Sequence, residues 1–114
     1  ISPQTVTEVI SPQTAKLITE MMVNAVDQGE AKWTRLAKFR IAGKTGTAQI
    51  PIKGHYDEEK TNASFIGFAP ADSPKFVMLV TLQEPSSSPW AAETAAPLWF
   101  DVAKDLFPYL GIMR

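Results

Sequence analysis

One short stretch of this chain places groups that could do chemistry on an otherwise bare backbone. Residues 43–47 have the sequence Gly-Lys-Thr-Gly-Thr, so one ammonium group and two hydroxyl groups stand beside two glycines. A glycine inside a strand usually marks a bulge or the close approach of a ligand or of another backbone. Exposed N–H and C=O groups next to a cation and hydroxyls suit the carboxylate and amides of a peptide. We therefore interpret the stretch as a carboxylate- and amide-binding edge.

The residues around this stretch predict a β-strand over 40–49. Aromatic and β-branched side chains recur there with period two, at Phe39, Ile41, Thr45 and Thr47. Strict alternation along a strand would send Lys44 and Thr45 to opposite faces. We expect both to reach one cleft by curling over the edge of the strand.

A phosphate-binding P-loop is excluded by spacing. That motif requires Gly-x-x-x-x-Gly-Lys-Ser/Thr, because its first glycine opens the turn that aims successive N–H groups at the phosphates. Gly43 and Lys44 would supply the second half, but Lys38 occupies the position of the first glycine. The intervening residues 39–42 also have the pattern of a strand and not of a loop.

The alternative is the Lys-Thr-Gly signature of penicillin-binding proteins and serine β-lactamases. Lys44-Thr45-Gly46-Thr47 matches it, preceded by Arg-Ile-Ala-Gly over 40–43 and followed by Thr-Ala-Gln over 47–49. Residues 63–72 then have the sequence Ala-Ser-Phe-Ile-Gly-Phe-Ala-Pro-Ala-Asp. Together these closely resemble the C-terminal part of the transpeptidase domain of class B (high-molecular-weight) penicillin-binding proteins. The resemblance covers roughly residues 10–111 and implies that 1–114 is a C-terminal fragment of one such domain.

The resemblance also implies roles for the signature residues. Lys44 would support the proton network of a serine active site and would be the one catalytic group in this chain. The Thr45 and Thr47 hydroxyls would bind the substrate or β-lactam carboxylate, and the Thr47 N–H would form half of the oxyanion hole. Gly46 completes the substrate-binding strand. A peptide would lie beside this strand as an added strand, which agrees with a bare edge.

Two further parts of such an enzyme are missing from the sequence. No serine is followed by lysine three residues later, and no Ser-x-Asn occurs. The nucleophilic serine and the base lysine are therefore not in this chain, and alone it should not catalyse. The resemblance implies a complete peptidoglycan D,D-transpeptidase that acts on D-Ala-D-Ala stem peptides and binds penicillin. That enzyme would lie on the extracytoplasmic face of the cytoplasmic membrane, periplasmic or cell-surface, with its anchor outside this chain.

Two other classes of function remain open. A β-lactamase or β-lactam sensor would share the Lys-Thr-Gly signature, although the 63–72 stretch favours the transpeptidase. A non-catalytic interaction module could instead use the same sheet edge to bind a peptide. An upstream Ser-x-x-Lys in the same reading frame would decide for the enzyme.

Composition excludes several partners. The net charge of −1 argues against nucleic acid or an anionic membrane surface. The chain has no cysteine, and His55, its single histidine, stands beside only flexible carboxylates, so we expect neither metal nor cofactor. No apolar run approaches the roughly 20 residues of a membrane span, so we expect no direct membrane contact by this segment. The predicted partners are a stem peptide or β-lactam and the missing N-terminal part of the protein.

The remaining pattern predicts an α+β fold, an antiparallel sheet flanked by helices, as in the C-terminal segment of the penicillin-binding fold. Ser11 and Pro12 are typical of a helix start, and periodic apolar residues carry that helix, with one core face, to about Gln28. We expect a polar connection over 30–38 and a charged loop over 50–60.

Two strands should follow, over 64–69 and 75–82, joined as a hairpin by a turn rich in proline. The second is almost continuously apolar, which predicts burial on both faces. From about Ala91 the pattern becomes helical, with Pro108 and Gly111 near its end. We expect this helix to cover the sheet.

Overall fold

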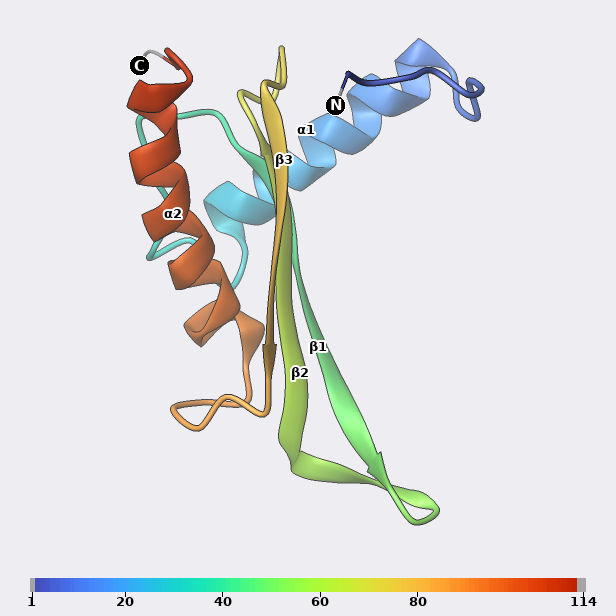
Figure 1. The fold of residues 1–114 in the computed structure, drawn as a ribbon, viewed down its shortest axis with the longest axis vertical. Helices are drawn as coiled ribbons and strands as arrows, with labels where there is room; N and C mark the ends of the chain where they lie inside the picture. The colour runs from blue at the N-terminus through green and yellow to red at the C-terminus, as the bar shows by residue number, and fades with distance from the viewer. Residues whose placement is uncertain (1, 113–114) are drawn as a thin grey trace.

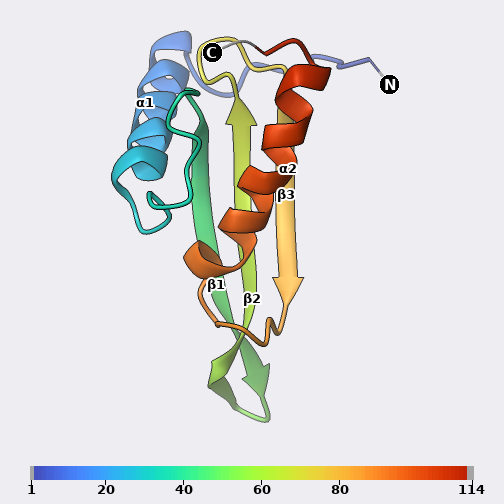
Figure 2. The ribbon, with the colours of Figure 1, turned by 90° about the vertical axis from the view of Figure 1, so that its left-hand side faces the viewer.

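The computed structural model describes residues 2–112 and contains one antiparallel sheet with a helix on each side. The strands β1 (Ala42–Ile52), β2 (His55–Ala69) and β3 (Phe76–Gln83) are adjacent in the order β1-β2-β3. Helix α2 (Ala95–Tyr109), preceded by the short 3₁₀ helix η1 (Ala91–Glu93), covers one face, and α1 (Pro12–Gln28) lies against β1 (Figures 1 and 2). The predicted α+β class and antiparallel sheet are confirmed. None of the helices within 2–112 is long and apolar enough to cross a membrane.

Helix α1 begins and ends where the sequence predicts. The Ser11 hydroxyl accepts a hydrogen bond from the Thr14 N–H at 3.1 Å, and Pro12 takes the first helical position. The predicted core face is wrong for the N-terminal half, because that half projects past the sheet (Figure 1) and leaves Ile18 43% exposed, and Met21 just beyond it is 64% exposed. Only Val23 and Val26, near the other end, are buried.

The core lies between α2 and the sheet and is mainly aromatic. Trp99 and Phe65 are fully buried, with ring centroids 5.3 Å apart, and Phe100 packs on both. The Trp99 indole Nε1 donates a hydrogen bond of 2.8 Å to the Met78 carbonyl of β3, so the largest buried side chain also has its polar group satisfied. This contact fixes α2 to the sheet.

The predicted burial of β3 on both faces is wrong in the described part of the chain. Its side chains alternate between half-buried and exposed. Met78 and Val80 pack against the core, whereas Val77 and Leu79 are 69% and 60% exposed. Within residues 2–112, β3 packs mainly against β2 and α2. Because α2 covers only one face, the apolar side chains on the other face stay exposed.

The predicted loop over 50–60 is also wrong, because the β1–β2 hairpin continues through it. The strands join at Lys53 and Gly54, whose φ angles of 30° and 89° make a tight two-residue turn. The register shifts between Gln49 and Ile50, and the Asp57 carboxylate accepts hydrogen bonds from the Glu59 and Lys60 N–H groups there. The hairpin therefore extends below β3 as a two-stranded ribbon (Figure 1).

Candidate functional site

Strand β1 carries the predicted site residues and forms an edge of the sheet. Lys44 and Thr45 pair with Ile66 and Phe65 of β2, and within residues 2–112 no strand pairs with the other side of β1. In an antiparallel edge strand every second residue directs its N–H and C=O outward. This edge can therefore accept an extended peptide as a further strand.

The structure brings Lys44 and Thr45 together. The Lys44 ammonium donates to the Thr45 carbonyl oxygen at 3.1 Å and to the Thr45 hydroxyl at 3.2 Å. Because the two side chains leave the strand on opposite faces, the lysine must fold over the edge to make these contacts. A cation and a hydroxyl thus meet beside the outward main-chain groups, which is a suitable pair for a carboxylate.

The Thr47 hydroxyl is bound by a different segment of the chain, the one that precedes α2. Its hydroxyl oxygen accepts a hydrogen bond of 3.1 Å from the Ala91 N–H at the start of η1. A hydroxyl that accepts one hydrogen bond keeps its own proton to donate. The structure therefore ties Thr47 to the segment before α2 and leaves its hydroxyl proton available to a ligand.

The two glycines of the signature region serve different purposes. A Cβ atom at Gly43 would lie 2.5 Å from the Phe65 ring and 3.1 Å from the Ile66 carbonyl oxygen, so this glycine is required by packing inside the sheet. A Cβ atom at Gly46 would meet nothing within 4 Å. The predicted close approach of another backbone is therefore confirmed for Gly43 by the Ile66 carbonyl oxygen, although the nearest neighbour of this glycine is the Phe65 ring. Gly46 leaves open space.

A small depression lies between the C-terminal end of α1 and β1. It has a volume of about 240 Å³ and is lined on one side by Gly29, Glu30 and Ala31 and on the other by Gly43, Lys44 and Thr45. No serine is among its lining residues. The site can bind and orient a carboxylate or an extended peptide, but it contains no activated nucleophile for acyl transfer.

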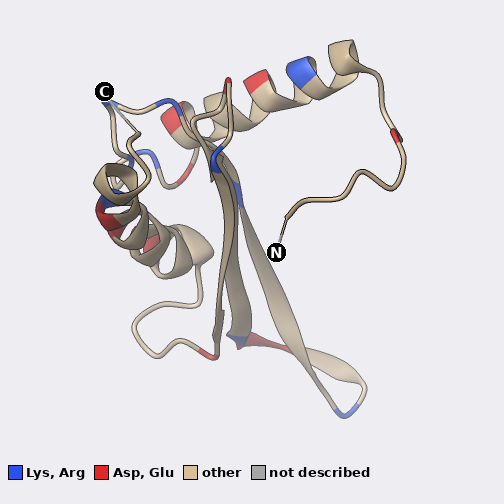
Figure 3. Cartoon of the chain, turned by 45° about the horizontal axis from the view of Figure 1, so that its top comes forward, with Lys and Arg blue, Asp and Glu red and all other residues tan. Residues whose placement is uncertain are grey.

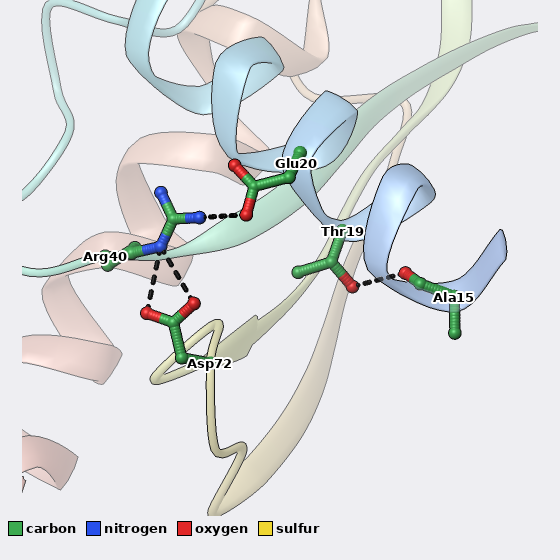
Figure 4. A network of polar contacts seen from close by, with 5 residues as sticks. All are labelled: Ala15, Thr19, Glu20, Arg40 and Asp72. Carbon is green, nitrogen blue, oxygen red and sulfur yellow. Dashed lines mark hydrogen bonds and ion pairs between the residues drawn. The ribbon is translucent and has the colours of Figure 1, made fainter. Parts of the chain in front are cut away.

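Arg40 fixes the start of β1, and the sequence analysis assigned it no role. Figure 4 shows its guanidinium between Glu20 of α1 and Asp72 of the β2–β3 connection; Nη2 contacts Glu20, and Nε lies 2.9 Å from Asp72 Oδ2. The Arg40 carbonyl also accepts a hydrogen bond of 2.8 Å from the Ala71 N–H. The hydrogen bond to Glu20, followed by that to Asp72, raises the pKa of Arg40 above its ordinary value.

This junction joins three elements four residues before Lys44, so it limits how β1 can shift against α1. Sequence reasoning missed it because its partners are 20 and 32 residues from Arg40. The only local signal is an arginine placed between the apolar residues Phe39 and Ile41. The contact between the Ala91 N–H and Thr47 was missed for the same reason, because the two residues are 44 positions apart in the sequence.

Comparison with protein families shows a match of residues 2–106 to the penicillin binding protein transpeptidase domain. Stage V sporulation protein D of Bacillus subtilis is 37% identical over 112 residues, which are 97% of this chain and 17% of that protein. The probable peptidoglycan D,D-transpeptidase PenA of Neisseria flavescens is 33% identical over 106 residues, 91% of this chain and 26% of that protein.

Solved structures agree with these relatives. The apo transpeptidase domain of penicillin-binding protein 3 from Burkholderia pseudomallei superimposes with a TM-score of 0.85 at 30% identity, over 97% of this chain and 34% of that one. Penicillin-binding protein 3 of Mycobacterium tuberculosis in complex with ampicillin gives 0.78 at 31% identity, over 91% and 25%. The chain thus spans between about a sixth and a third of the proteins it matches, and it is a partial transpeptidase domain.

Proposed function

The chain belongs to the penicillin-binding protein transpeptidase family, and we propose that it is the C-terminal segment of the catalytic domain of a class B peptidoglycan D,D-transpeptidase. The observation that carries the proposal is the Lys44–Thr45 pair at the open edge of β1. The complete enzyme transfers an acyl group from a D-Ala-D-Ala stem peptide. The remainder of the domain supplies the nucleophilic serine and its base lysine.

In the proposed reaction the stem peptide lies along the outer edge of β1 and pairs with its main chain. Lys44 stabilises the developing charge and the proton network of the acylated serine. The Thr45 hydroxyl and the free proton of the Thr47 hydroxyl hold the terminal carboxylate of the peptide or of a β-lactam. Gly46 lets the substrate backbone approach, which is supported by the open space beside it. The Thr47 N–H forms half of the oxyanion hole.

The partners follow from the same proposal. A stem peptide or a β-lactam occupies the site, and the N-terminal remainder of the protein completes it. The structural relative in complex with ampicillin supports the β-lactam. An enzyme of peptidoglycan acts outside the cytoplasm, so we place the protein on the extracytoplasmic face of the membrane, with an anchor outside these residues. The relatives named as peptidoglycan D,D-transpeptidases favour this function over a β-lactamase, a sensor or a peptide-binding module.

The central experiment changes Lys44→Ala in the complete enzyme that contains this chain. Losing one charge-assisted hydrogen bond in a water-excluded cleft should slow acylation by penicillin by about 30- to 1,000-fold. The thermal midpoint should barely move, since within this chain the Lys44 side chain is exposed and its hydrogen bonds are with the adjacent Thr45. The measurement is the second-order acylation rate of each variant, taken beside its thermal midpoint.

The matched control is Lys16→Ala on the exposed half of α1, which should keep acylation within about threefold. Lys75 is a poorer control, because its ammonium donates to the Leu110 carbonyl at 3.2 Å. Wild-type acylation by Lys44→Ala, or a loss of activity explained by unfolding, would show that the match to the signature is accidental.

A second experiment tests whether the nucleophilic serine lies outside this chain. The 114-residue chain alone should form no stable covalent adduct with a fluorescent penicillin, because it lacks an activated serine. The complete enzyme should be labelled under the same conditions. Labelling of any serine in the isolated chain would contradict the assignment of the nucleophile to the rest of the domain.

A further inference from the structure

A second and larger recess lies away from the Lys44 site, between the connection that precedes β1 and the C-terminal end of α2. This groove has a volume of about 760 Å³. Its apolar lining includes Leu36 and Phe39 from the connection and Phe107 and Ile112 from the end of the chain. The Phe39 and Phe107 rings lie with centroids 4.3 Å apart, so the floor is a packed aromatic surface. Its size is that of a typical ligand or peptide side-chain pocket.

The polar lining of the groove is entirely cationic. Arg35, Lys38 and Lys104 contribute to it, and no acidic residue does. Figure 3 shows both Lys/Arg and Asp/Glu positions on α2 and near the C-terminal end of the chain, so the positive character belongs to the lining of the groove and not to this whole side of the molecule. Arg35 is already paired with Asp27 at 3.5 Å, whereas Lys38 and Lys104 form no ion pair among residues 2–112. In a chain whose net charge is −1, an all-cationic recess is a local exception.

We propose that this groove docks an acidic segment of a partner protein, with apolar side chains against the aromatic floor and carboxylates on Lys38 and Lys104. Charge complementarity supports that occupant, because a carboxylate is the group that pairs with a lysine while the adjacent side chains fill an apolar recess. The groove is separate from the edge of β1, so the proposal does not depend on the function assigned to Lys44.

An anionic membrane surface fits less well. Asp101 and Asp105 are exposed on α2 beside Lys104 and do not line the groove. A flat anionic surface that approached α2 would meet these carboxylates as well as the lysines and would be repelled by them. A narrow peptide that enters the recess reaches the lysines alone.

The experiment uses the complete protein that contains this chain and a fluorescein-labelled peptide in which Glu alternates with Leu and Phe. Fluorescence anisotropy should show saturable binding. The double variant Lys38→Glu with Lys104→Glu should weaken it by about tenfold or more, since each exposed charge pair contributes modestly and is reversed. Ala37→Trp, which adds a large side chain at an exposed lining position, should block binding without changing the surface charge.

The matched control is Lys16→Glu with Lys60→Glu, which makes the same change of charge at two exposed sites elsewhere. It should bind the peptide as the wild type does. Penicillin acylation and the thermal midpoint should be unchanged in the groove variants, which separates this proposal from the one about Lys44. Equal binding by the Lys38/Lys104 variant, or equal binding of a peptide with Lys in place of Glu, would overturn the proposal. So would preferential binding to phosphatidylglycerol vesicles, or self-association that the charge reversal abolishes. Failure of the complete wild-type protein to bind the peptide would also overturn it, since the remainder of the domain would then cover the groove.

Discussion

The two faces of the sheet differ sharply although the same three strands build both. On the face toward α2, Trp99 and Phe65 are excluded from solvent. On the opposite face, Ile66, Val77 and Leu79 are 45%, 69% and 60% exposed. The exposed side of β3 includes Val77 and Leu79, which are as apolar as the residues facing α2, so their sequence does not decide their burial. Burial is decided by whether an element lies over them, and α2 lies over only one face.

This difference matters because the chain is a partial domain. A strand that is apolar on both faces is typical of a sheet covered on both sides. We therefore expect the row Ile66, Val77 and Leu79 to be covered in the complete protein. In the isolated chain, the α2 face should carry nearly all of the stability that β3 contributes. Substitutions on the two faces test this directly.

The largest effect is expected for Trp99→Ala. Removal of a fully buried tryptophan leaves a cavity and an unpaired Met78 carbonyl, which should lower the free energy of unfolding by about 3 to 5 kcal/mol. Urea unfolding of the chain measures this loss. Trp90→Ala is the control, since Trp90 is 58% exposed and should cost far less. A similar loss of unfolding free energy for both variants would contradict the packing of α2 against the sheet through Trp99.

A smaller effect is expected from adding one methyl group between the sheet and α2. A Cβ atom at Gly67 would lie 2.8 Å from the Trp99 ring and 3.1 Å from the Ala42 carbonyl oxygen. Gly67→Ala should therefore destabilise the chain by about 1 to 3 kcal/mol. Gly46→Ala is the matched control, because nothing lies within 4 Å of its Cβ position. It should be neutral or slightly stabilising through the unfolded state, and an equal loss at both glycines would contradict the packing account.

The smallest effect is expected on the exposed face. Leu79→Thr places a β-branched residue of high strand propensity in β3 and should change the free energy of unfolding of the isolated chain by no more than about 0.5 kcal/mol. Val80→Thr, at the next position and half-buried toward α2, should cost about 1 kcal/mol because a hydroxyl enters the core. A greater cost for Leu79→Thr in the complete protein than in the isolated chain would show that the remainder of the domain covers this face. Equal costs would argue against it.

Local patterns were sufficient to predict the elements with strong periodicity. Ser11, Pro12 and the apolar repeat that follows predicted a helix from the start of α1 to about Gln28. The alternation over 39–47 predicted a strand over 40–49, and the observed strand is β1 at Ala42–Ile52. The ribbon over 50–60 has no such sustained pattern, since most of its residues are charged or prone to turns. It is a strand pair because the β1–β2 hairpin continues into it and because Asp57 satisfies the N–H groups at the register shift.

Burial and long-range contacts could not be predicted in the same way. The exposure of Met21 depends on where the sheet ends, and that of Leu79 depends on what lies above β3. A sequence motif identified the residues of the candidate site. It did not predict the contacts that hold those residues in place. Arg40, Glu20 and Asp72 meet only after the chain has folded, and no spacing among them marks the contact.

The burial of Trp99 gives the chain an optical property. Its three tryptophans divide into one that is excluded from solvent and two, Trp33 and Trp90, that are 64% and 58% exposed. Iodide in solution should quench the emission of the exposed pair and leave that of Trp99, shifted to shorter wavelength by its apolar surroundings. The fluorescence that survives quenching therefore reports whether α2 is docked on the sheet, without any added label.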